Sequence, residues 1–371
     1  MSPAAIERAM AGCLEQIIVG LGGVGEISIE RNPAEFNKTF GFRADFKLKD
    51  GPQVELWVDV RRNPRPSMFP YVNITRVFDV RSLKKAKARV FAAPHVSPRM
   101  AELCENHGWS WFDLSGNCHI RIPGLINIHH TGNSPVHATP KPDANLGTSE
   151  AARVVRALLA SELLTRRIWT QRGLRSRCEP GVSLGLVNKI VRHLREEGFL
   201  AGSNGRGFQV ADPPGLLQAW RNAYGLDLHH QIGYFTLLNG WKLLDALSAV
   251  FTASRGKLVY AAFSAANIQA PHVREPKTWV YVSDNELPAF EKILETKPVD
   301  SGANLMVLVP SDDGVFAYPD GGLIEDRPIA CTSLVQTYVD LWHCGGRGQE
   351  AAEALLEQRL KPAWRAAGYQ I

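Results

Sequence analysis

The chain has 371 residues, of which 45% are hydrophobic and 21% charged, with 32 glycines and 23 prolines. This composition is typical of a globular protein and excludes collagen-like, disordered and coiled-coil classes. At about 150 residues per domain, the length predicts two to three domains. No uncharged apolar run reaches the roughly 18 residues that a membrane helix needs, so no membrane partner is expected.

The N-terminus and the cysteines indicate a reducing compartment. Glu7 and Glu15 interrupt the first apolar stretch, which does not have the pattern of a secretory signal. Six cysteines are spread along the chain without a C-x-x-C pair, so neither a disulfide framework nor a structural zinc site is predicted. We therefore expect a cytoplasmic protein without a metal or other cofactor.

Proline and glycine divide the chain into three regions. The stretch 131–148 holds three prolines and small polar residues without apolar periodicity, which predicts a linker. A second break falls at Pro213 and Pro214. The predicted domains are residues 1–132, a linker over 133–147, residues 148–213, and residues 214–371.

The first region mixes helices and strands in an α/β pattern. Helical spacing covers residues 3–17, and a helix capped by Ser97 with Pro98 at its first position covers 97–107. A weaker helix is predicted near 80–88. Alternating or apolar runs predict strands over 26–30, 43–49, 54–60, 90–93 and 110–114.

Three residues on these strands are similar to the site of a PD-(D/E)xK nuclease. In that core two acids hold a divalent metal and a lysine positions the attacking water. Asp45 and Asp59 occupy the acid positions, but Arg61 stands where the lysine should be. Arginine is permanently charged and bulkier, so it is a poor substitute for lysine chemistry. We expect a restriction-endonuclease-like α/β domain with a degenerate site, and a metal-dependent nuclease remains the alternative.

Other motifs in the first region have simpler explanations. Residues 20–25 match G-x-G-x-x-G, but a predicted helix precedes them and a strand follows, so we expect a helix-to-strand turn. Asp113 and Asn117 follow a buried strand, where a turn held by side-chain-to-backbone hydrogen bonds is expected. The pairs His129-His130 and His229-His230 lack metal-ligand spacing and are predicted to be surface histidines.

The middle region has the element order of a winged helix-turn-helix. The pattern predicts helices over 148–164, 171–177 and 183–197, then a hairpin wing over 199–210. Residues 151–210 carry eleven basic and four acidic side chains, a net charge of +7, whereas the remaining residues sum to −2. Such a basic block predicts nucleic-acid binding.

The third helix should enter the major groove while the wing meets the adjacent backbone or minor groove. Asn188 is suited to adenine, and Lys189 or Arg192 to guanine or phosphate. Helix-turn-helix folds also serve as protein-protein modules, which is the alternative for this region. The predicted DNA-binding residues are Ser183, Asn188, Lys189, Arg192, Asn204 and Arg206.

The third region is predicted to be α/β and nucleotidyltransferase-like. Helices are expected over 215–224, 236–251, 287–295, 332–344 and 349–360, and strands over 258–263, 279–282, 305–309 and 315–318. Residues 263–267 (FSAAN) stand where a nucleotidyltransferase carries Gly-Ser and paired acids, and they lack both the glycine and the acids. Catalysis is not expected there. Residues 345–348 (GGRG) are predicted to be a turn between helices rather than an anion site.

Three motifs together resemble the AbiEi-type antitoxin family of type IV toxin-antitoxin systems. They are DLSGN at 113–117, SLGLV at 183–187, and VQTYVDL at 335–341 with GRGQEAAE at 346–353. The resemblance implies a repressor that binds repeats in its own promoter and counteracts a nucleotidyltransferase-like toxin. The chain departs from that family in carrying a nuclease-like region before the winged helix.

The sequence therefore favours a non-enzymatic regulator that binds double-stranded DNA. The alternatives are a DNA-cutting enzyme that uses Asp45 and Asp59, and a sensor with a small-molecule pocket in its C-terminal domain. The sequence leaves the operator, a toxin partner and the oligomeric state open.

Overall fold

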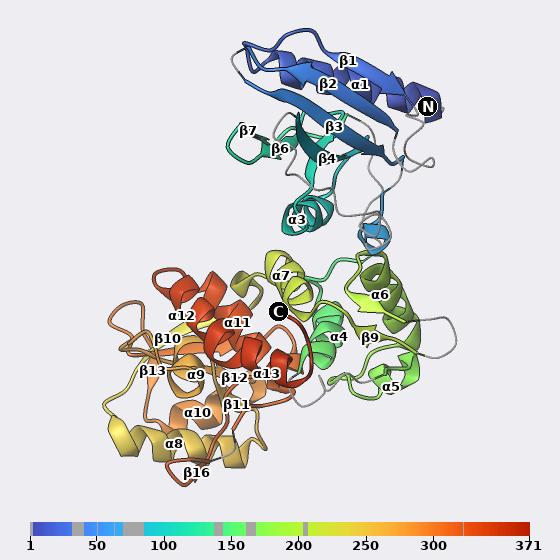
Figure 1. The fold of residues 1–371 in the computed structure, drawn as a ribbon. Helices are drawn as coiled ribbons and strands as arrows, with labels where there is room; N and C mark the ends of the chain where they lie inside the picture. Colours follow the sequence, from blue (N-terminus) through green and yellow to red (C-terminus); the bar gives the residue numbers. More distant parts are fainter. Residues whose placement is uncertain are drawn as a thin grey trace. The chain divides into compact units, whose positions relative to one another are not determined.

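The computed structural model describes residues 3–31, 41–49, 51–62, 64–69, 85–136, 144–160, 168–202, 207–321 and 323–371. Of the described residues, 43% are helical and 23% lie in strands, which confirms the predicted mixed α/β class. The chain forms two compact units, the first made of residues 1–141 and 196–198 and the second of the remainder (Figure 1). Within the described ranges, no helix combines the length and the apolarity that crossing a bilayer requires.

In the first unit, seven strands of the described residues form one sheet whose order follows the chain. The strands β3, β4 and β5 run parallel to one another, and the other neighbours pair antiparallel. The elements are α1 (Pro3–Val19), β1 (Ser28–Arg31), β2 (Phe42–Lys47), β3 (Gln53–Val60), η1 (Pro66–Met68), β4 (Lys85–Ala93), α3 (Pro98–Asn106), β5 (Ser110–Asp113), β6 (Cys118–Ile122) and β7 (Ile126–His130).

Alternation along the strands gives this sheet two different faces. Phe42, Ala44 and Phe46 on β2 face the core formed with α1, in which Met10 and Leu14 are fully buried. The second face packs against α3 and forms a separate core rich in aromatic residues. This core includes Trp57, Phe69, Phe91, Met100, Cys104, Trp109 and Trp111. Ser97 caps α3 by accepting from the Met100 N–H at 3.3 Å, as predicted.

Two predictions in this unit are corrected. The expected helix over 80–88 is wrong for residues 85–88, which belong to β4, while residues 80–84 lie outside the described part. The strand β4 pairs with β3 on one side and with β5 on the other, and this pairing outweighs the helix preference of the Ala and Lys residues in β4. The sequence reading also missed the hairpin β6–β7, where Cys118 pairs with His130 and Ile122 with Ile126.

The second unit begins with helices and a short hairpin. The helices are α4 (Ser149–Leu159), α5 (Gln171–Arg175), α6 (Leu184–Glu196) and α7 (Pro213–Ala223), and the hairpin consists of β8 (Leu200–Ala201) and β9 (Gln209–Val210). Trp169, between α4 and α5, forms a β-bridge with Phe208 next to β9. Their backbone hydrogen bonds of 2.6 and 2.9 Å add a third short segment to the hairpin.

The rest of the second unit contains a mixed sheet in the order β11-β12-β14-β10-β13. Its strands are β10 (His230–Phe235), β11 (Leu258–Tyr260), β12 (Thr278–Val282), β13 (Lys297–Pro298) and β14 (Leu305–Val309), and a separate ribbon pairs β15 (Leu323–Ile324) with β16 (Arg327–Pro328). The α-helices are α8 (Gly240–Ala253), α9 (Ala262–Gln269), α10 (Leu287–Ile293), α11 (Leu334–His343), α12 (Gly348–Leu355) and α13 (Lys361–Ala366). The 3₁₀ turns are η3 (Leu226–Leu228), η4 (Asp284–Glu286) and η5 (Asp313–Phe316), and η6 (Leu356–Leu360) is a π-helix.

Two strand predictions in this region differ from the structure, and one strand was not predicted. The expected strand over 315–318 is wrong, because its first half belongs to the 3₁₀ turn η5, which Asp312 caps by accepting from the Gly314 N–H, and the rest is not a strand. The expected strand over 258–263 ends at Tyr260, and Ala262 begins α9. The strand β10 was missed, and it pairs with both β14 and β13.

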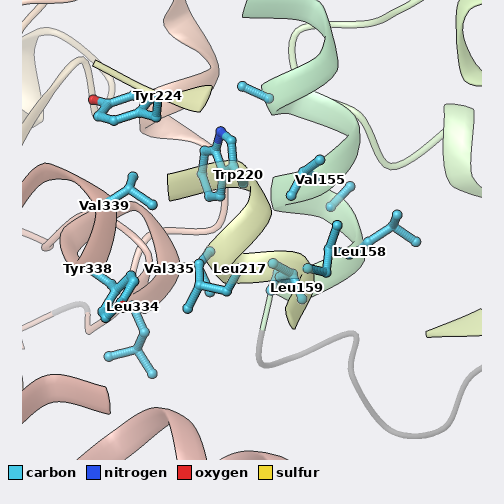
Figure 2. Close-up of a cluster of buried hydrophobic side chains, with 14 of the residues drawn as sticks. Val155, Leu158, Leu159, Leu217, Trp220, Tyr224, Leu334, Val335, Tyr338 and Val339 are labelled. Carbon is cyan, nitrogen blue, oxygen red and sulfur yellow. The ribbon is translucent and has the colours of Figure 1, made fainter. Parts of the chain in front are cut away.

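One hydrophobic core joins the first helices of the second unit to its C-terminal helices. Figure 2 shows Val155 and Leu159 of α4 on one side and Leu334 and Val339 of α11 on the other. Leu217 and Trp220 of α7 lie between them, and Tyr224, just after α7, lies on the side of Val339. The helix α4 is therefore held inside this unit by α7 and α11.

Candidate nucleic-acid interface

The helix α6 has one buried face and one exposed face, as its sequence predicts. Val187, Ile190, Val191 and Leu194 are buried, and Leu186 is only partly so. The exposed side chains follow at helical spacing on the other side and include those predicted for DNA contact, which are Ser183, Asn188, Lys189 and Arg192. The buried stripe thus turns a polar and cationic surface toward solvent.

Ser183 and Asn188, both predicted DNA-binding residues, make hydrogen bonds at this surface. The Ser183 hydroxyl accepts from the Leu186 N–H at 3.2 Å, so it caps α6. The Asn188 Oδ1 accepts from the Gln171 Nε2 of α5 at 3.2 Å. This bond links the two helices at the surface and uses the carbonyl of Asn188 rather than its NH₂ group.

The neighbouring helix α5 adds cations to this surface. Thr170 caps it by accepting from the Gly173 N–H at 3.0 Å. Exposed basic side chains on and beside α5 and α6 are Arg172, Arg175, Arg177, Lys189 and Arg192. We call these five residues, together with Asn188, the α5–α6 surface. The predicted wing residues Asn204 and Arg206 lie outside the described residues.

The basic segment does not expose all of the charge that the sequence count assigned to it. Arg156 is only 3% exposed, and its Nε and Nη2 donate to Gln336 Oε1 at 3.1 and 2.7 Å. Arg153 forms an ion pair with Asp312, to which its Nε donates at 2.9 Å. Both arginines therefore bind α4 to later segments of the unit instead of contributing to a surface for nucleic acid.

Burial affects both the contacts and the pKa of Arg156. Its guanidinium lies 5.4 Å from the centre of the Trp220 ring. Complete burial lowers the pKa of Arg156, while the carboxylate of Asp312 opposes the shift. The arginine is accommodated because hydrogen bonds and an aromatic face replace part of its hydration.

The prediction of surface histidines is wrong for His229, which is buried, whereas His230 is exposed. The Ser311 N–H points at His229 Nδ1 at 3.2 Å, which makes that nitrogen the acceptor and places the proton on Nε2. His229 Nε2 then lies 2.8 Å from the Tyr224 hydroxyl, which donates to Asp340 Oδ1 at 2.5 Å. A chain of hydrogen bonds thus runs from the backbone to a buried carboxyl.

Asp340 is the centre of this buried network. Its Oδ1 also accepts from Gln336 Nε2 at 2.8 Å and from the Tyr281 hydroxyl at 3.1 Å. Burial raises the pKa of Asp340 to about 7, although these hydrogen bonds and Arg156 oppose the shift. Burial likewise lowers the pKa of His229 to about 4. The sequence contained no signal for this network, because its members come from segments that only the fold brings together.

The nuclease-like candidates do not form a common site. Asp45 on β2 pairs across the sheet with Glu55 on β3, and Asp59 lies four residues further along β3, about 13 Å away at about 3.3 Å per residue. Two oxygens bound to one Mg²⁺ at about 2.1 Å lie at most about 4.2 Å apart. Asp45 and Asp59 therefore cannot hold the same ion in this arrangement.

Each of these carboxylates has an arginine partner instead. Arg43 Nε lies 2.8 Å from Asp45 Oδ2. Arg61 contacts Asp59 in a bidentate manner, with Nε 2.7 Å from Oδ1 and Nη2 2.9 Å from Oδ2. Burial raises the pKa of Asp59, and Arg61 opposes that shift. Arg61 thus serves as a counter-ion for Asp59.

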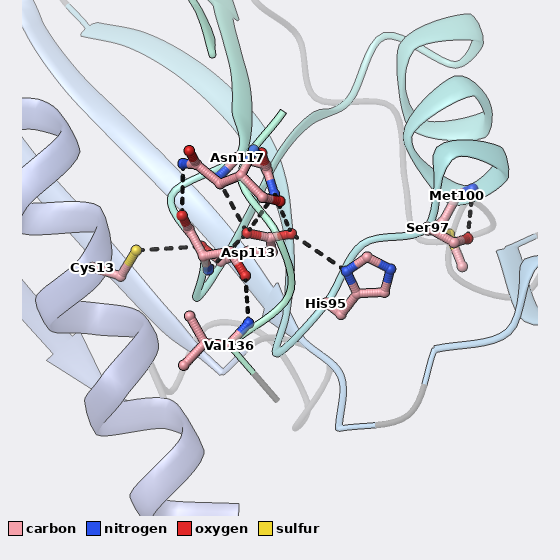
Figure 3. Close-up of polar contacts among 9 residues, drawn as sticks. Cys13, His95, Ser97, Met100, Asp113, Asn117 and Val136 are labelled. Atoms are coloured by element: carbon pink, nitrogen blue, oxygen red, sulfur yellow. Dashed lines mark hydrogen bonds and ion pairs between the residues drawn. The ribbon is translucent and has the colours of Figure 1, made fainter. Parts of the chain in front are cut away.

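The segment 113–117 forms the turn that was predicted. Asp113 is fully buried, and its Oδ1 accepts from the Ser115 N–H at 2.8 Å and the Asn117 N–H at 3.1 Å. Figure 3 shows this turn with Cys13, whose thiol points to the Asp113 carbonyl at 3.4 Å, and with His95, which lies 3.7 Å from its carboxylate. These contacts account for Asp113 and Asn117 as structural residues.

The glycine-rich segments also serve as turns. Gly22 and Gly23, both at φ near +67°, connect α1 to β1, so residues 20–25 do not precede a helix. Gly345 and Gly346 have positive φ between α11 and α12. The conformations of these four glycines are the left-handed ones that residues with a side chain rarely adopt.

An open cavity of about 780 Å³ lies in the C-terminal part of the second unit. Ser264 and Asn267, from the segment compared with a nucleotidyltransferase, line it on α9. Other lining residues provide aromatic, basic and acidic groups, namely Trp241, Tyr260, Phe263, His272, Arg274, Lys277, Glu275 and Glu325. The volume falls within the range of small-molecule pockets, which is about 300 to 1,000 Å³.

Comparisons with known proteins give little support to any family. No family model matches the chain, and no curated protein matches it. Among solved structures, the chain is similar to ANT(2″)-Ia in complex with adenylyl-2″-tobramycin, with 12% identity and a TM-score of 0.24. That match covers 34% of this chain and 95% of the other. So low a TM-score carries no argument about this chain.

Proposed function

We propose that this protein is a transcriptional regulator that binds double-stranded DNA through a winged helix-turn-helix made of α4, α5, α6 and the hairpin β8–β9. Support comes from the order of these elements and from the bridge between Trp169 and Phe208, which extends the hairpin. In this arrangement α6 is the recognition helix and lies in the major groove.

The observation that carries the proposal is the α5–α6 surface. Asn188, Lys189 and Arg192 are exposed on α6, opposite its buried stripe, and three more exposed arginines lie on and beside α5, which Gln171 links to Asn188. Asn188 provides an amide of the kind that recognises adenine, and the cations provide contacts to guanine or phosphate. Arg153 and Arg156 take no part in DNA binding under this proposal.

We extend the proposal to the cellular role of the family that the sequence resembles. The regulator would bind repeats in its own promoter and counteract a nucleotidyltransferase-like toxin, as AbiEi-type antitoxins do. The first unit would be a restriction-endonuclease-like domain that no longer cuts, and the end of the chain a nucleotidyltransferase-like domain without catalytic acids. The motifs at 183–187 and 335–341 support this extension.

The experiment is a selection of bound fragments from random DNA, followed by binding titrations over a range of salt concentrations. For each phosphate that the protein neutralises, the logarithm of the affinity falls by about 0.9 per tenfold rise in salt. The variant Lys189→Ala should weaken binding and make this dependence less steep by about 1 if Lys189 contacts a phosphate. Arg192→Ala should weaken binding as well.

Asn188→Ala separates base reading from backbone contact. If Asn188 reads a base, the variant should lose about 1 to 3 kcal/mol on the selected site and relax specificity at one position. The matched control is Lys292→Ala, which removes an exposed lysine on α10, and it should bind like the wild type. The proposal is wrong if no DNA is enriched, or if Lys189→Ala and Lys292→Ala bind equally.

The nuclease alternative has its own test. Incubating the protein with plasmid DNA and Mg²⁺ or Mn²⁺ should leave the plasmid intact, because Asp45 and Asp59 are far apart and each is paired with an arginine. Metal-dependent cutting that Asp59→Ala abolishes would overturn the non-enzymatic proposal.

The cavity in the second unit favours a regulator that responds to a small molecule. Its lining combines aromatic rings with two basic side chains, Arg274 and Lys277, and two acidic ones, Glu275 and Glu325, so it suits a flat polar compound. Trp241, which also lines it, is 62% exposed. A screen of aromatic carboxylates and nucleotides by tryptophan fluorescence should find a ligand whose signal is lost in Trp241→Ala. If none binds, this part of the proposal fails and DNA binding is unaffected.

A further inference from the structure

We propose that Glu105, His119 and His129 form a binding site for a divalent transition-metal ion in the first unit. One ligand atom from each residue lies within 4.8 Å of the other two. The three residues come from α3, β6 and β7, so tertiary structure and not sequence spacing brings them together. From the sequence, His129 was predicted to be a surface histidine because the pair His129-His130 lacks metal-ligand spacing, and no role was predicted for His119.

The sheet explains why the two histidines meet. His119 on β6 and His129 on β7 are directly opposed across the antiparallel pair, so both project from the same face. Their rings are stacked with centroids 4.7 Å apart and planes 19° apart. Trp111 on β5 pairs with His119 on the other side, which places the indole in the same row.

The helix α3 supplies the third ligand from above this row. Glu105 Oε1 lies 3.0 Å from His119 Nδ1 and accepts from the Trp111 Nε1–H at 2.9 Å. Carboxylates that bind metals are commonly oriented in this way by a hydrogen bond to a neighbouring group. If Trp111 holds one carboxylate oxygen, the other is available to the ion.

Two imidazoles and one carboxylate are a ligand set that zinc uses in proteins, with a fourth position left for water or for another molecule. Ligand atoms around a tetrahedral Zn²⁺ at about 2.05 Å are about 3.3 Å apart. The donor atoms here need to approach by about 1.5 Å at most. Side-chain rotation can provide this, because the side chains of Glu105 and His119 are 38% and 19% exposed and His129 is exposed.

The test is metal binding by the full-length protein after removal of any histidine tag and treatment with a chelator. Titration with Zn²⁺ in a calorimeter should show one ion per chain. Titration with Co²⁺ should give the visible bands of a tetrahedral site without the thiolate-to-metal absorption that a cysteine ligand causes. The latter result would distinguish this site from binding by one of the six cysteines.

Single substitutions assign the ligands. His129→Ala, an exposed position that should not affect folding, and His119→Ala should each weaken Zn²⁺ binding by at least about 100-fold, since losing a ligand costs more than losing an outer hydrogen bond. Trp111→Phe, which keeps the ligands and removes only the indole N–H, should weaken it by about 10-fold. Circular dichroism verifies that each variant is folded.

His130→Ala is the matched control, because this exposed histidine is adjacent in sequence and pairs with Cys118 toward the opposite face of the sheet. It should bind Zn²⁺ as tightly as the wild type. The proposal is overturned if the wild type shows no saturable binding, or if His129→Ala and His130→Ala bind with the same affinity.

Discussion

The buried carboxyl of Asp340 makes the second unit less stable as pH rises, which is the opposite of the usual effect of an aspartate. A rise of its pKa from 3.8 to about 7 corresponds to about 4 kcal/mol at 1.36 kcal/mol per pH unit. Between these two pH values the folded state binds more protons than the unfolded chain. The contribution of Asp340 to the free energy of unfolding therefore falls as pH rises from about 4 to about 7.

His229 acts in the opposite direction over nearly the same range. Its pKa falls from 6.5 to about 4 on folding, so here the unfolded chain binds more protons. Its contribution to the free energy of unfolding rises with pH by about 3 kcal/mol between these values. The two groups therefore largely cancel in the wild type, and a substitution is needed to reveal either effect.

The informative substitution is Asp340→Asn, which keeps an oxygen to accept from Gln336 and Tyr281 but cannot ionise. Urea unfolding followed by tryptophan fluorescence gives the free energy of unfolding of both proteins from pH 4 to pH 8. The value for the wild type minus that for the variant cancels the other titrating groups. This difference should fall by about 4 kcal/mol, mostly below pH 7.

The exposed aspartate Asp300 provides the control, since Asp300→Asn should leave the profile of the wild type in place. A difference between wild type and Asp340→Asn that changes by less than about 1 kcal/mol over this range would refute the reasoning. The carboxyl would then be either ionised in the folded state at low pH or accessible to water.

Three further substitutions test local contacts, each by urea unfolding. Thr148→Ala removes the N-cap of α4 and should cost about 1 kcal/mol, whereas Thr148→Ser should retain most of the stability. Asp113→Ala leaves buried N–H groups of its turn, including that of Asn117, without an acceptor and should cost about 2 kcal/mol or more; Asp113→Asn should recover part of this loss. Asp312→Ala breaks the ion pair with Arg153 and should cost about 2 to 3 kcal/mol, and a loss below about 0.5 kcal/mol would mean that water replaces the pair.

Local pattern was enough to predict those elements whose faces differ in polarity. The stripe of α6 and the alternation in β2 and β3 place apolar side chains at a fixed period, so the sequence contains the signal. The cap of α3 is also visible locally, because Ser97 is followed by a proline at the first helical position. The hairpin β6–β7 and the helix α9 were missed, and β4 was partly assigned to a helix. Their form depends on pairing and packing partners that are distant in the sequence.

The candidate sites divide in the same way. Asn188, Lys189 and Arg192 could be placed on an exposed helix face from spacing alone. The burial of Arg156 could not be predicted, because it requires α11 to provide Gln336 more than a hundred residues later. The meeting of Glu105 with His119 and His129 likewise depends on strand register. A charge count over a segment cannot distinguish arginines that face solvent from arginines that cross-link two parts of a fold.

The burial of α4 has a consequence for how this protein can evolve and be engineered. Many small modules are exchanged between proteins as independent cassettes, but the described part of residues 148–213, which we propose to bind DNA, packs too closely on the rest of its unit for such exchange. Excised from its chain, α4 would expose Val155 and Leu159 to water, and Arg156 would lose both Gln336 and the ring of Trp220. Recombination would have to carry α4 and the C-terminal helices together as one block.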